Sequence, residues 1–266
     1  MDNNIGEFSI YNGEIVNSNY QKIENILNKG VKYYEVIRII NYKPIFLEDH
    51  IKRLYNSLDN KKSINLPEKK QFSIYINKLL KINKYSDCNI KIIYNKDFLS
   101  FAIFINKFYY PEKNEYVKGV NTVSLKLVRN NPNKKILNDE YIKIINEIKK
   151  EKNVFEIILL NENNYITEGS RSNVFFIKDN YLITMSDDNV LKGITREYVI
   201  KYCNDNKIKL VKKEIKYKEL KEISVIFLTG TSINILPVKK IDNISFDFEK
   251  NIILKKIMKG FIEYIK

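Results

Sequence analysis

The chain has 266 residues, of which 44% are hydrophobic and 12% aromatic, and its formal net charge is +14. This composition predicts a folded chain with room for one large domain or two modest ones. Two cysteines and one histidine are too few for a disulfide framework or for a metal site built on several Cys or His ligands. We see no secretory signal and no apolar run near the roughly 20 residues that span a bilayer, so we expect a cytoplasmic protein without a membrane partner.

The positive charge is spread along the chain rather than gathered in one block. Lysines are scattered among glutamates, and no stretch combines a sustained basic run with interleaved aromatic residues. We therefore expect no nucleic-acid partner. Lysine serves nearly everywhere, so each arginine is a candidate for a task that needs a planar, bidentate donor. The five arginines are Arg38, Arg53, Arg129, Arg171 and Arg196.

The first part of the chain predicts strands followed by two helices and two more strands. Alternating and helical apolar spacings predict these elements in order: strands at 8–11 and 33–40, a turn at 41–44, a helix at about 48–58, a second helix beginning near Pro67, and strands at 90–94 and 101–105. A polar, proline-containing stretch follows, and we expect a linker near 110–118. It divides the chain into a smaller domain, 1–112, and a larger one, 113–266.

The second part mixes strands and helices without a regular alternation. The expected elements are strands at 123–128, 154–160 and 225–229, a turn at 161–164, and helices at 139–151, 195–203 and 248–264. This order predicts an α+β fold with mostly antiparallel sheets.

The segment 165–177 looks like a hairpin, but the residues between its two arms are unusual for one. Two apolar, strand-like arms flank Glu168-Gly169-Ser170-Arg171-Ser172-Asn173. A carboxylate beside a buried face costs free energy unless something cationic or protonated meets it. Glu168 therefore needs a partner that the segment itself does not supply.

Two further segments place small polar residues where a phosphate could bind. Gly193, Ile194 and Thr195 stand at a predicted helix start, where backbone N–H groups and the helix dipole attract anions. Gly230-Thr231-Ser232 ends a predicted strand. Taken alone, the first segment favours an ordinary N-cap with a turn glycine, and the second is compatible with a turn.

A third pattern pairs the strand at 33–38 with the helix at 48–54. His50 is the only histidine, and we expect it to be a hydrogen-bonded structural residue. Arg53 lies three positions further on, on the same helix face, where its guanidinium can bind a phosphate bidentately.

Together these segments, in this order from about Tyr33 to Val238, resemble the class IV pyridoxal-phosphate enzymes: branched-chain aminotransferases, D-amino-acid aminotransferases and aminodeoxychorismate lyases. The resemblance implies a two-domain α+β fold of type IV, with a smaller N-terminal α/β domain and a larger domain of mostly antiparallel sheet. It also implies pyridoxal 5'-phosphate as cofactor and a homodimer.

The resemblance assigns roles residue by residue. Glu168 stands where the family's glutamate pairs with the pyridine nitrogen, and Arg53 where its arginine binds the phosphate. Gly193, Ile194 and Thr195 match the phosphate-cradling segment, and Thr231 matches a threonine near the same phosphate. Asn173 closes the turn that lines the cofactor.

The lysine that carries the cofactor has a weaker signature. In lyase and D-amino-acid members it precedes an asparagine by three residues, and Lys135 with Asn138 reproduces that spacing. Lys134 is the adjacent competitor. A lysine acting as a neutral amine must be desolvated or held near another cation, because its ordinary pKa is about 10.4.

The substrate is less well defined than the chemistry. The region 97–109 has neither Arg nor His, which argues against the R-x-H carboxylate trap of D-amino-acid members. We expect an aminotransferase acting on a small amino acid, with branched-chain amino acids among the candidates, and on a 2-oxo acid such as 2-oxoglutarate. The alternatives are an aminodeoxychorismate lyase on the same scaffold and, more distantly, a non-catalytic basic binding module. The candidate substrate residues are Tyr34, Arg38, Arg171 and Ser232.

Overall fold

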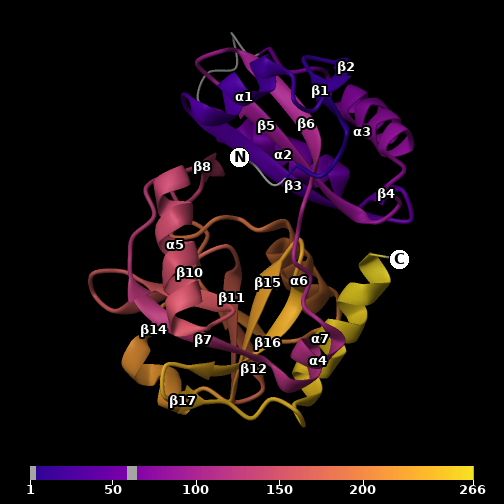
Figure 1. The fold of residues 1–266 in the computed structure, drawn as a ribbon. Coiled ribbons are helices and arrows are strands. Elements are labelled where there is room, and N and C mark those ends of the chain that lie inside the picture. Colours follow the sequence, from indigo (N-terminus) through magenta and orange to yellow (C-terminus); the bar gives the residue numbers. More distant parts are fainter. Residues whose placement is uncertain (1–3, 59–64, 266) are drawn as a thin grey trace. The chain divides into compact units, whose positions relative to one another are not determined.

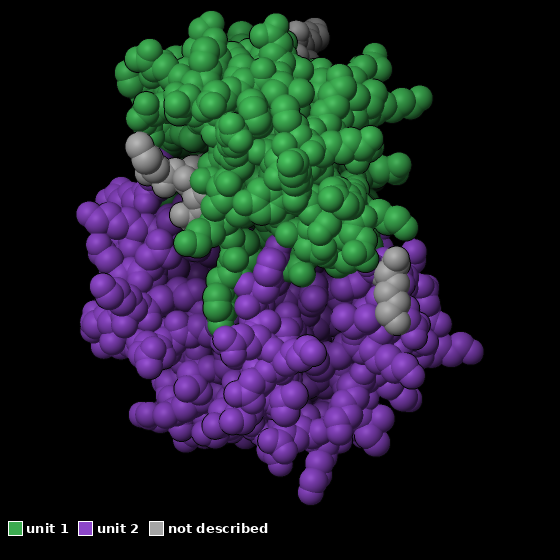
Figure 2. Space-filling model, turned by 45° about the vertical axis from the view of Figure 1, so that its right-hand side comes forward, with its two compact units in different colours: residues 1–109, 134–138 green, residues 110–133, 139–266 purple. Residues whose placement is uncertain are grey.

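A computed structural model describes residues 4–58 and 65–265 of the chain. The chain divides into two compact units, which Figure 2 shows in different colours. Unit 1 comprises residues 1–109 together with 134–138, and unit 2 comprises 110–133 together with 139–266. The short stretch 134–138 thus packs with the smaller unit, although the residues before and after it in the sequence belong to the larger one.

Unit 1 consists of one β-sheet and the helices that pack on it (Figure 1). Within the described residues its sheet has seven strands in the order β2-β1-β6-β5-β3-β4, with β8 paired to β3, and every pairing is antiparallel. The strands are β1 (Phe8–Tyr11), β2 (Glu14–Asn17), β3 (Lys32–Ile40), β4 (Lys43–Pro44), β5 (Cys88–Asn95), β6 (Ser100–Asn106) and β8 (Ile136–Leu137).

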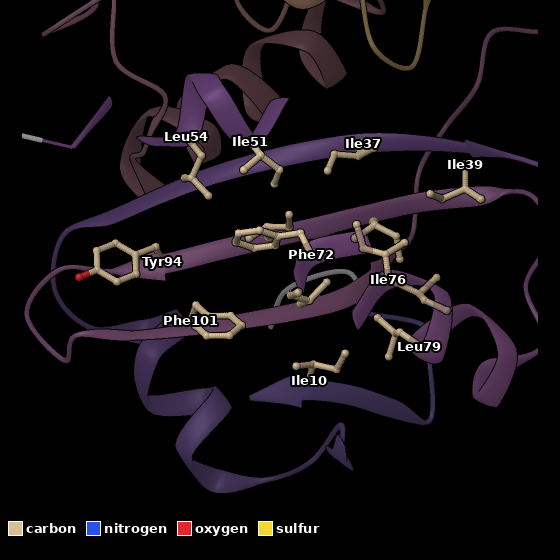
Figure 3. Close-up of a cluster of buried hydrophobic side chains, with 14 of the residues drawn as sticks. Ile10, Ile37, Ile39, Ile51, Leu54, Phe72, Ile76, Leu79, Tyr94 and Phe101 are labelled. Carbon is tan, nitrogen blue, oxygen red and sulfur yellow. The ribbon is translucent and has the colours of Figure 1, made fainter. Parts of the chain in front are cut away.

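Helices cover both faces of this sheet because its central strands are apolar on both faces. The side chains of α2 (Leu47–Ser57) and α3 (Lys69–Asn83) pack against one face, and α1 (Gln21–Asn28) packs against the other. In β5, Ile92 belongs to the first cluster and Ile93 to the second, as the alternation of a strand requires. Figure 3 shows the first cluster, whose labelled residues include Ile51 and Leu54 of α2 and Ile37 and Ile39 of β3.

Unit 2 contains a ten-stranded sheet within its described residues, in the order β13-β12-β11-β15-β16-β7-β9-β10-β14, with β17 paired to β16. Three pairings are parallel (β12 with β13, β16 with β7, and β7 with β9), and the others are antiparallel. The strands are β7 (Val120–Lys126), β9 (Glu156–Leu160), β10 (Tyr165–Gly169), β11 (Asn173–Lys178), β12 (Tyr181–Thr184), β13 (Leu210–Lys212), β14 (Ile215–Lys216), β15 (Val225–Gly230), β16 (Asn234–Ile241) and β17 (Ile244–Ser245).

The helices of unit 2 lie against this sheet at different places. Ile145 of α5 (Asp139–Lys152) packs on Ile157 and Leu159 of β9, whose other face contributes Ile158 to the main core. The remaining helices are α4 (Lys113–Lys118), α6 (Ile194–Asp205), the 3-10 helix η2 (Tyr217–Glu222) and α7 (Ile252–Tyr264). The α+β class with mostly antiparallel sheets is confirmed.

Several expected boundaries were wrong. The strand expected at 123–128 is β7, which ends at Lys126. The linker expected near 110–118 stays a prediction, and that stretch contains the short helix α4, which begins with a capping box of Glu112 and Glu115. The C-terminal helix begins at Ile252 rather than 248, because the Asn251 side chain accepts a hydrogen bond from the Leu254 N–H and caps it there.

The segment 165–177 is also not a hairpin. Its two arms are β10 and β11, as expected, but β10 pairs with β9 and β14, whereas β11 pairs with β12 and β15. The turn between them therefore joins two separate parts of the sheet.

Candidate active site

The turn between β10 and β11 is held by a buried carboxylate. Glu156, which is 3% exposed, accepts hydrogen bonds from the Ser170 hydroxyl, from Ser172 Oγ at 3.0 Å and from the Arg171 N–H at 3.3 Å. At Gly169 an added Cβ would lie 2.0 Å from Ser172 Oγ. The hydrogen bonds of Glu156 thus constrain the turn, and a side chain at position 169 would displace Ser172.

Glu168 lies at the end of β10, immediately before this turn. Its side chain is nearly fully buried, and three donors contact it. Arg129 Nη1 lies 2.7 Å from Oε1, whereas the Leu191 N–H and Asn173 Nδ2 lie 3.1 and 3.4 Å from Oε2. The structure therefore supplies a cation for this carboxylate from within unit 2.

Asn173 ties the carboxylate to the start of α6. Its Nδ2 donates to the Leu191 carbonyl at 2.8 Å as well as to Glu168. A Cβ added to Gly193 would lie 2.0 Å from Asn173 Oδ1, so a larger residue at this position would displace the Asn173 side chain. One hydrogen-bonded cluster therefore joins Glu168 and Asn173 to the segment preceding α6. It brings together the motif at 165–177 and the motif at 193–195.

The N-terminus of α6 has the features of an anion site. The helix begins at Ile194 with Gly193 as N-cap, and no side chain caps it. Ile194 and Thr195 are both buried. The first N–H groups of a helix lack intrahelical partners, and the dipole adds positive potential there. The expected helix at 195–203 is confirmed, and α6 extends it by one residue at its start and two at its end.

A third motif lies on the neighbouring strand. β11 pairs with β15 so that Asn173 lies opposite Thr229, and the two side chains share one face of the sheet. Within the described part of the chain, the buried Thr229 hydroxyl has no hydrogen-bond partner. Thr231 and Ser232 follow in the turn after β15, half-buried and buried respectively.

Lys135 lies in unit 1, against the edge of its sheet. β8 pairs with the start of β3, and the Tyr34 N–H donates to the Lys135 carbonyl at 3.0 Å. The Lys135 ammonium lies 4.6 Å from the centre of the Tyr34 ring. The buried Lys91 lies 5.6 Å from the same ring. Lys134, the competitor, is half-buried like Lys135.

Arg53 also belongs to unit 1, and its guanidinium contacts the buried carboxylate of Glu35. Nε and Nη2 lie 2.7 and 2.6 Å from the two carboxylate oxygens, and His50 Nδ1 lies 2.8 Å from Oε2. Burial opposes ionisation of Glu35, but the charge and hydrogen bonds of Arg53 and His50 outweigh it and lower the pKa to about 2. The expectation that His50 is a hydrogen-bonded structural residue is confirmed.

The remaining arginine candidates occupy different environments. Arg38 is half-buried on the face of β3 opposite Glu35. Arg171 is exposed, and its Nη2 donates to Asn146 of α5 at 2.7 Å. Arg196 is fully buried and bonds the Met185 carbonyl and Asp187 at 2.7 and 2.9 Å.

Sequence reasoning gave no site role to Glu35, Lys91, Arg129 or Thr229. Two were recognisable: Glu35 interrupts the apolar positions of a strand, and Arg129 is one of five arginines. Across residues 4–58 and 65–265 we find no group of three or more His, Cys, Asp or Glu side chains that could hold a metal ion. No helix in these same ranges is both long and apolar enough to cross a membrane.

The fold and this cluster define a two-unit α+β protein with a buried carboxylate beside an uncapped helix start. Comparison with known families gives the class: the model for amino-transferase class IV matches residues 32–241. This match covers most of the chain, which therefore belongs to that family of enzymes. The resemblance inferred from the sequence motifs is confirmed.

Individual relatives are similar at low identity. A D-alanine aminotransferase from Bacillus licheniformis is 28% identical over 255 residues, which cover 88% of this chain and 88% of that protein. A probable branched-chain-amino-acid aminotransferase from Thermotoga maritima is 30% identical over 113 residues, covering 42% of this chain and 41% of the relative. The chain thus spans less than half the length of that relative.

A solved structure matches the fold over nearly the whole chain. It is a putative branched-chain amino acid aminotransferase from Thermotoga maritima, with a TM-score of 0.82 and 25% identity. The alignment covers 97% of this chain and 95% of that one.

Proposed function

We propose that the protein is a pyridoxal-phosphate-dependent aminotransferase that moves an amino group between a small amino acid and a 2-oxo acid. The observation that carries the proposal is the position of Glu168. This buried carboxylate shares one hydrogen-bonded cluster with the segment that opens α6. A carboxylate suits a protonated ring nitrogen, and a helix start suits a phosphate.

The residues of unit 2 fit such a cofactor chemically. A pyridine ring with a phosphate arm needs an acidic partner for its nitrogen and several neutral donors for its phosphate. Glu168 meets the first need, and the N–H groups of Ile194 and Thr195 with the Thr195 hydroxyl meet the second. The buried Thr229 hydroxyl, without a partner among the described residues, is a further donor.

Glu168 would keep a proton on the ring nitrogen. When bound, pyridoxal phosphate supplies the electron sink that stabilises negative charge at the substrate Cα. A carboxylate held by Arg129, Leu191 and Asn173 cannot swing away from the proton it faces. Such preorganisation is a large source of transition-state stabilisation.

Lys135 would carry the cofactor and then move the proton at the substrate Cα. The backbone contact with Tyr34 anchors its position, and the ring of Tyr34 lies beneath its ammonium group. A base within reach of the proton that it moves contributes typically 10²–10⁴-fold to the rate. Lys134 remains the competing assignment.

The substrate proposal depends on the branched-chain relatives and on the D-alanine relative. We favour a small, branched-chain amino donor with 2-oxoglutarate as acceptor, as the branched-chain relatives suggest. The D-alanine aminotransferase that matches 88% of the chain makes stereochemistry the first property to test. Tyr34, Arg38, Arg171 and Ser232 stay the candidate substrate residues, and a homodimer stays the expected assembly.

The test is a panel of single-turnover reactions on protein reconstituted with pyridoxal phosphate. Each amino donor, in L and D forms, is mixed without a 2-oxo acid, and the cofactor absorbance is followed. An aminotransferase converts its cofactor once and then stops until a 2-oxo acid is added. A lyase acting on aminodeoxychorismate releases pyruvate over many turnovers without any acceptor. Protein that binds no cofactor and gives no reaction would contradict the proposal.

A further inference from the structure

A charged side chain lies within the apolar core of unit 1. Burial alternates along β3, and Glu35 faces the same side as Tyr33, Ile37 and Ile39. These three residues belong to the same core cluster as Ile51 and Leu54 of α2, and Figure 3 labels Ile37 and Ile39 among them. Its exposure is 0%. An isolated carboxylate at such a place costs several kcal/mol, so it is tolerated only with close cationic or hydrogen-bonding partners.

The partners come from a single helix. His50 and Arg53 are three residues apart on α2, so both side chains point from one face of the helix towards β3. Arg53 uses Nε for Oε1 and Nη2 for Oε2, which is a two-point contact. Two parallel bonds fix the plane of a guanidinium as well as its position.

The charges of this cluster cancel. Glu35 is ionised at neutral pH, since its pKa is lowered to about 2. Burial, together with the charges of Arg53 and Lys135, lowers the pKa of His50 despite its bond to Glu35, so the imidazole is neutral. Arg53 is always cationic. The cluster therefore provides an oriented donor rather than a net positive charge.

We propose that Glu35 is a positioning residue that holds Arg53 for the cofactor phosphate. The planar guanidinium carries five N–H donors, and its contact with Glu35 uses Nε and Nη2. The inference deepens the proposed function and rests on it, because it assumes that Arg53 binds the phosphate.

A competing role predicts an effect of opposite sign. If Glu35 were only a counter-ion, it would compete with the phosphate for Arg53, and its removal would strengthen phosphate binding. If Glu35 orients Arg53, its removal leaves a mobile guanidinium, and phosphate binding weakens. The sign of the change in affinity therefore separates the two roles.

The experiment compares two ligands on cofactor-free full-length protein: pyridoxal phosphate, and pyridoxal, which lacks the phosphate. In Glu35→Gln we expect the Kd for pyridoxal phosphate to rise by about tenfold to a hundredfold, the equivalent of one or two charge-assisted hydrogen bonds. The Kd for pyridoxal should change less than about twofold, which is within the error of comparing closely related variants. An unchanged or lower Kd for pyridoxal phosphate, or an equal rise for both ligands, would overturn the proposal.

Two further variants complete the test. In an Arg53→Lys background, Glu35→Gln should have little additional effect, since the residue it positions is gone. Glu35→Asp keeps the charge but shortens the side chain, so it should also weaken pyridoxal phosphate binding, and it decides the question if Glu35→Gln does not fold. Wild-type affinity in Glu35→Asp would contradict the orienting role. If the wild-type protein binds neither ligand, the proposed function itself is wrong.

Discussion

Arg129 Nη1 lies 2.7 Å from Glu168 Oε1, so the carboxylate assigned to the cofactor nitrogen already has an arginine partner. The two side chains are 19% and 4% exposed. Because Oε2 is held separately by Leu191 and Asn173, both oxygens of Glu168 are fixed. Arg129 thus orients the carboxylate, and a ring nitrogen would share it rather than capture a free side chain.

Replacing Glu168 should therefore damage chemistry more than binding. In Glu168→Gln the amide cannot keep the ring nitrogen protonated, and we expect kcat to fall by about 10²–10³-fold, as when one preorganised electrostatic contact is lost. The Kd for pyridoxal phosphate should change far less, because the phosphate contacts remain. Steady-state kinetics and cofactor titration measure the two effects. The control is Glu222→Gln, which removes only an exposed ion pair with Lys178.

Adding one methyl group at Gly193 should destabilise the protein. In Gly193→Ala the Cβ would lie 2.0 Å from Asn173 Oδ1, which would displace Asn173 from Leu191 and Glu168. We expect a loss of about 1–3 kcal/mol in the free energy of unfolding, typical of overpacking. On an Asn173→Ala background the same change should cost less, because the clashing atom is absent. Equal costs in both backgrounds, measured by denaturant unfolding, would refute this account of the glycine.

Stability should fall as the pH drops below about 6.5 because of one residue. His50 is the only histidine, and its pKa is lowered from 6.5 by burial first, with Arg53 and Lys135 adding to the effect. The unfolded chain therefore takes up a proton at higher pH than the folded one, so the contribution is present above pH 6.5 and is lost as the pH falls. The slope is at most about 1.4 kcal/mol per pH unit.

Urea unfolding at several pH values measures this slope, with His50→Gln as the matched variant. The variant should be less stable at neutral pH, because it changes the contact with Glu35, but its stability should depend much less on pH in this window. A slope that persists in the variant would show that another group titrates there.

The two thiols should report separately on the two units. Cys88 lies in unit 1 and Cys203 in unit 2, both are buried, and burial raises the pKa of each to about 12. At pH 8 the thiolate fraction is then about one in ten thousand, so a thiol reagent should react far more slowly with native than with unfolded protein. Single Cys→Ser variants assign each rate. Rapid reaction of a native thiol would contradict its burial.

The sequence predicted the parts of the site that depend on local pattern. Gly193 and Thr195 were expected at a helix start, and α6 begins there. Apolar alternation likewise predicted β3 and β11. These features follow from spacing along one element, which a single sequence displays directly.

The spacing of residues within one helix or strand could not predict contacts between distant segments. Arg129 meets Glu168 across 39 positions, and Arg53 meets Glu35 across 18. The pairing of β10 and β11 with different neighbours depends on the order of the whole sheet, so the hairpin expected at 165–177 was wrong. The interruption of an apolar face by Glu35 was a visible signal, but its partner depended on how α2 packs on β3.

The most direct test of the proposed chemistry is the site of covalent attachment. Protein reconstituted with pyridoxal phosphate, freed of excess cofactor and reduced with borohydride should lose its visible absorbance band. Peptide mass spectrometry should then find the phosphopyridoxyl group on Lys135, and Lys135→Ala should have neither band nor label. A label on Lys134 that disappears in Lys134→Ala, or no retained label at all, would contradict the assignment.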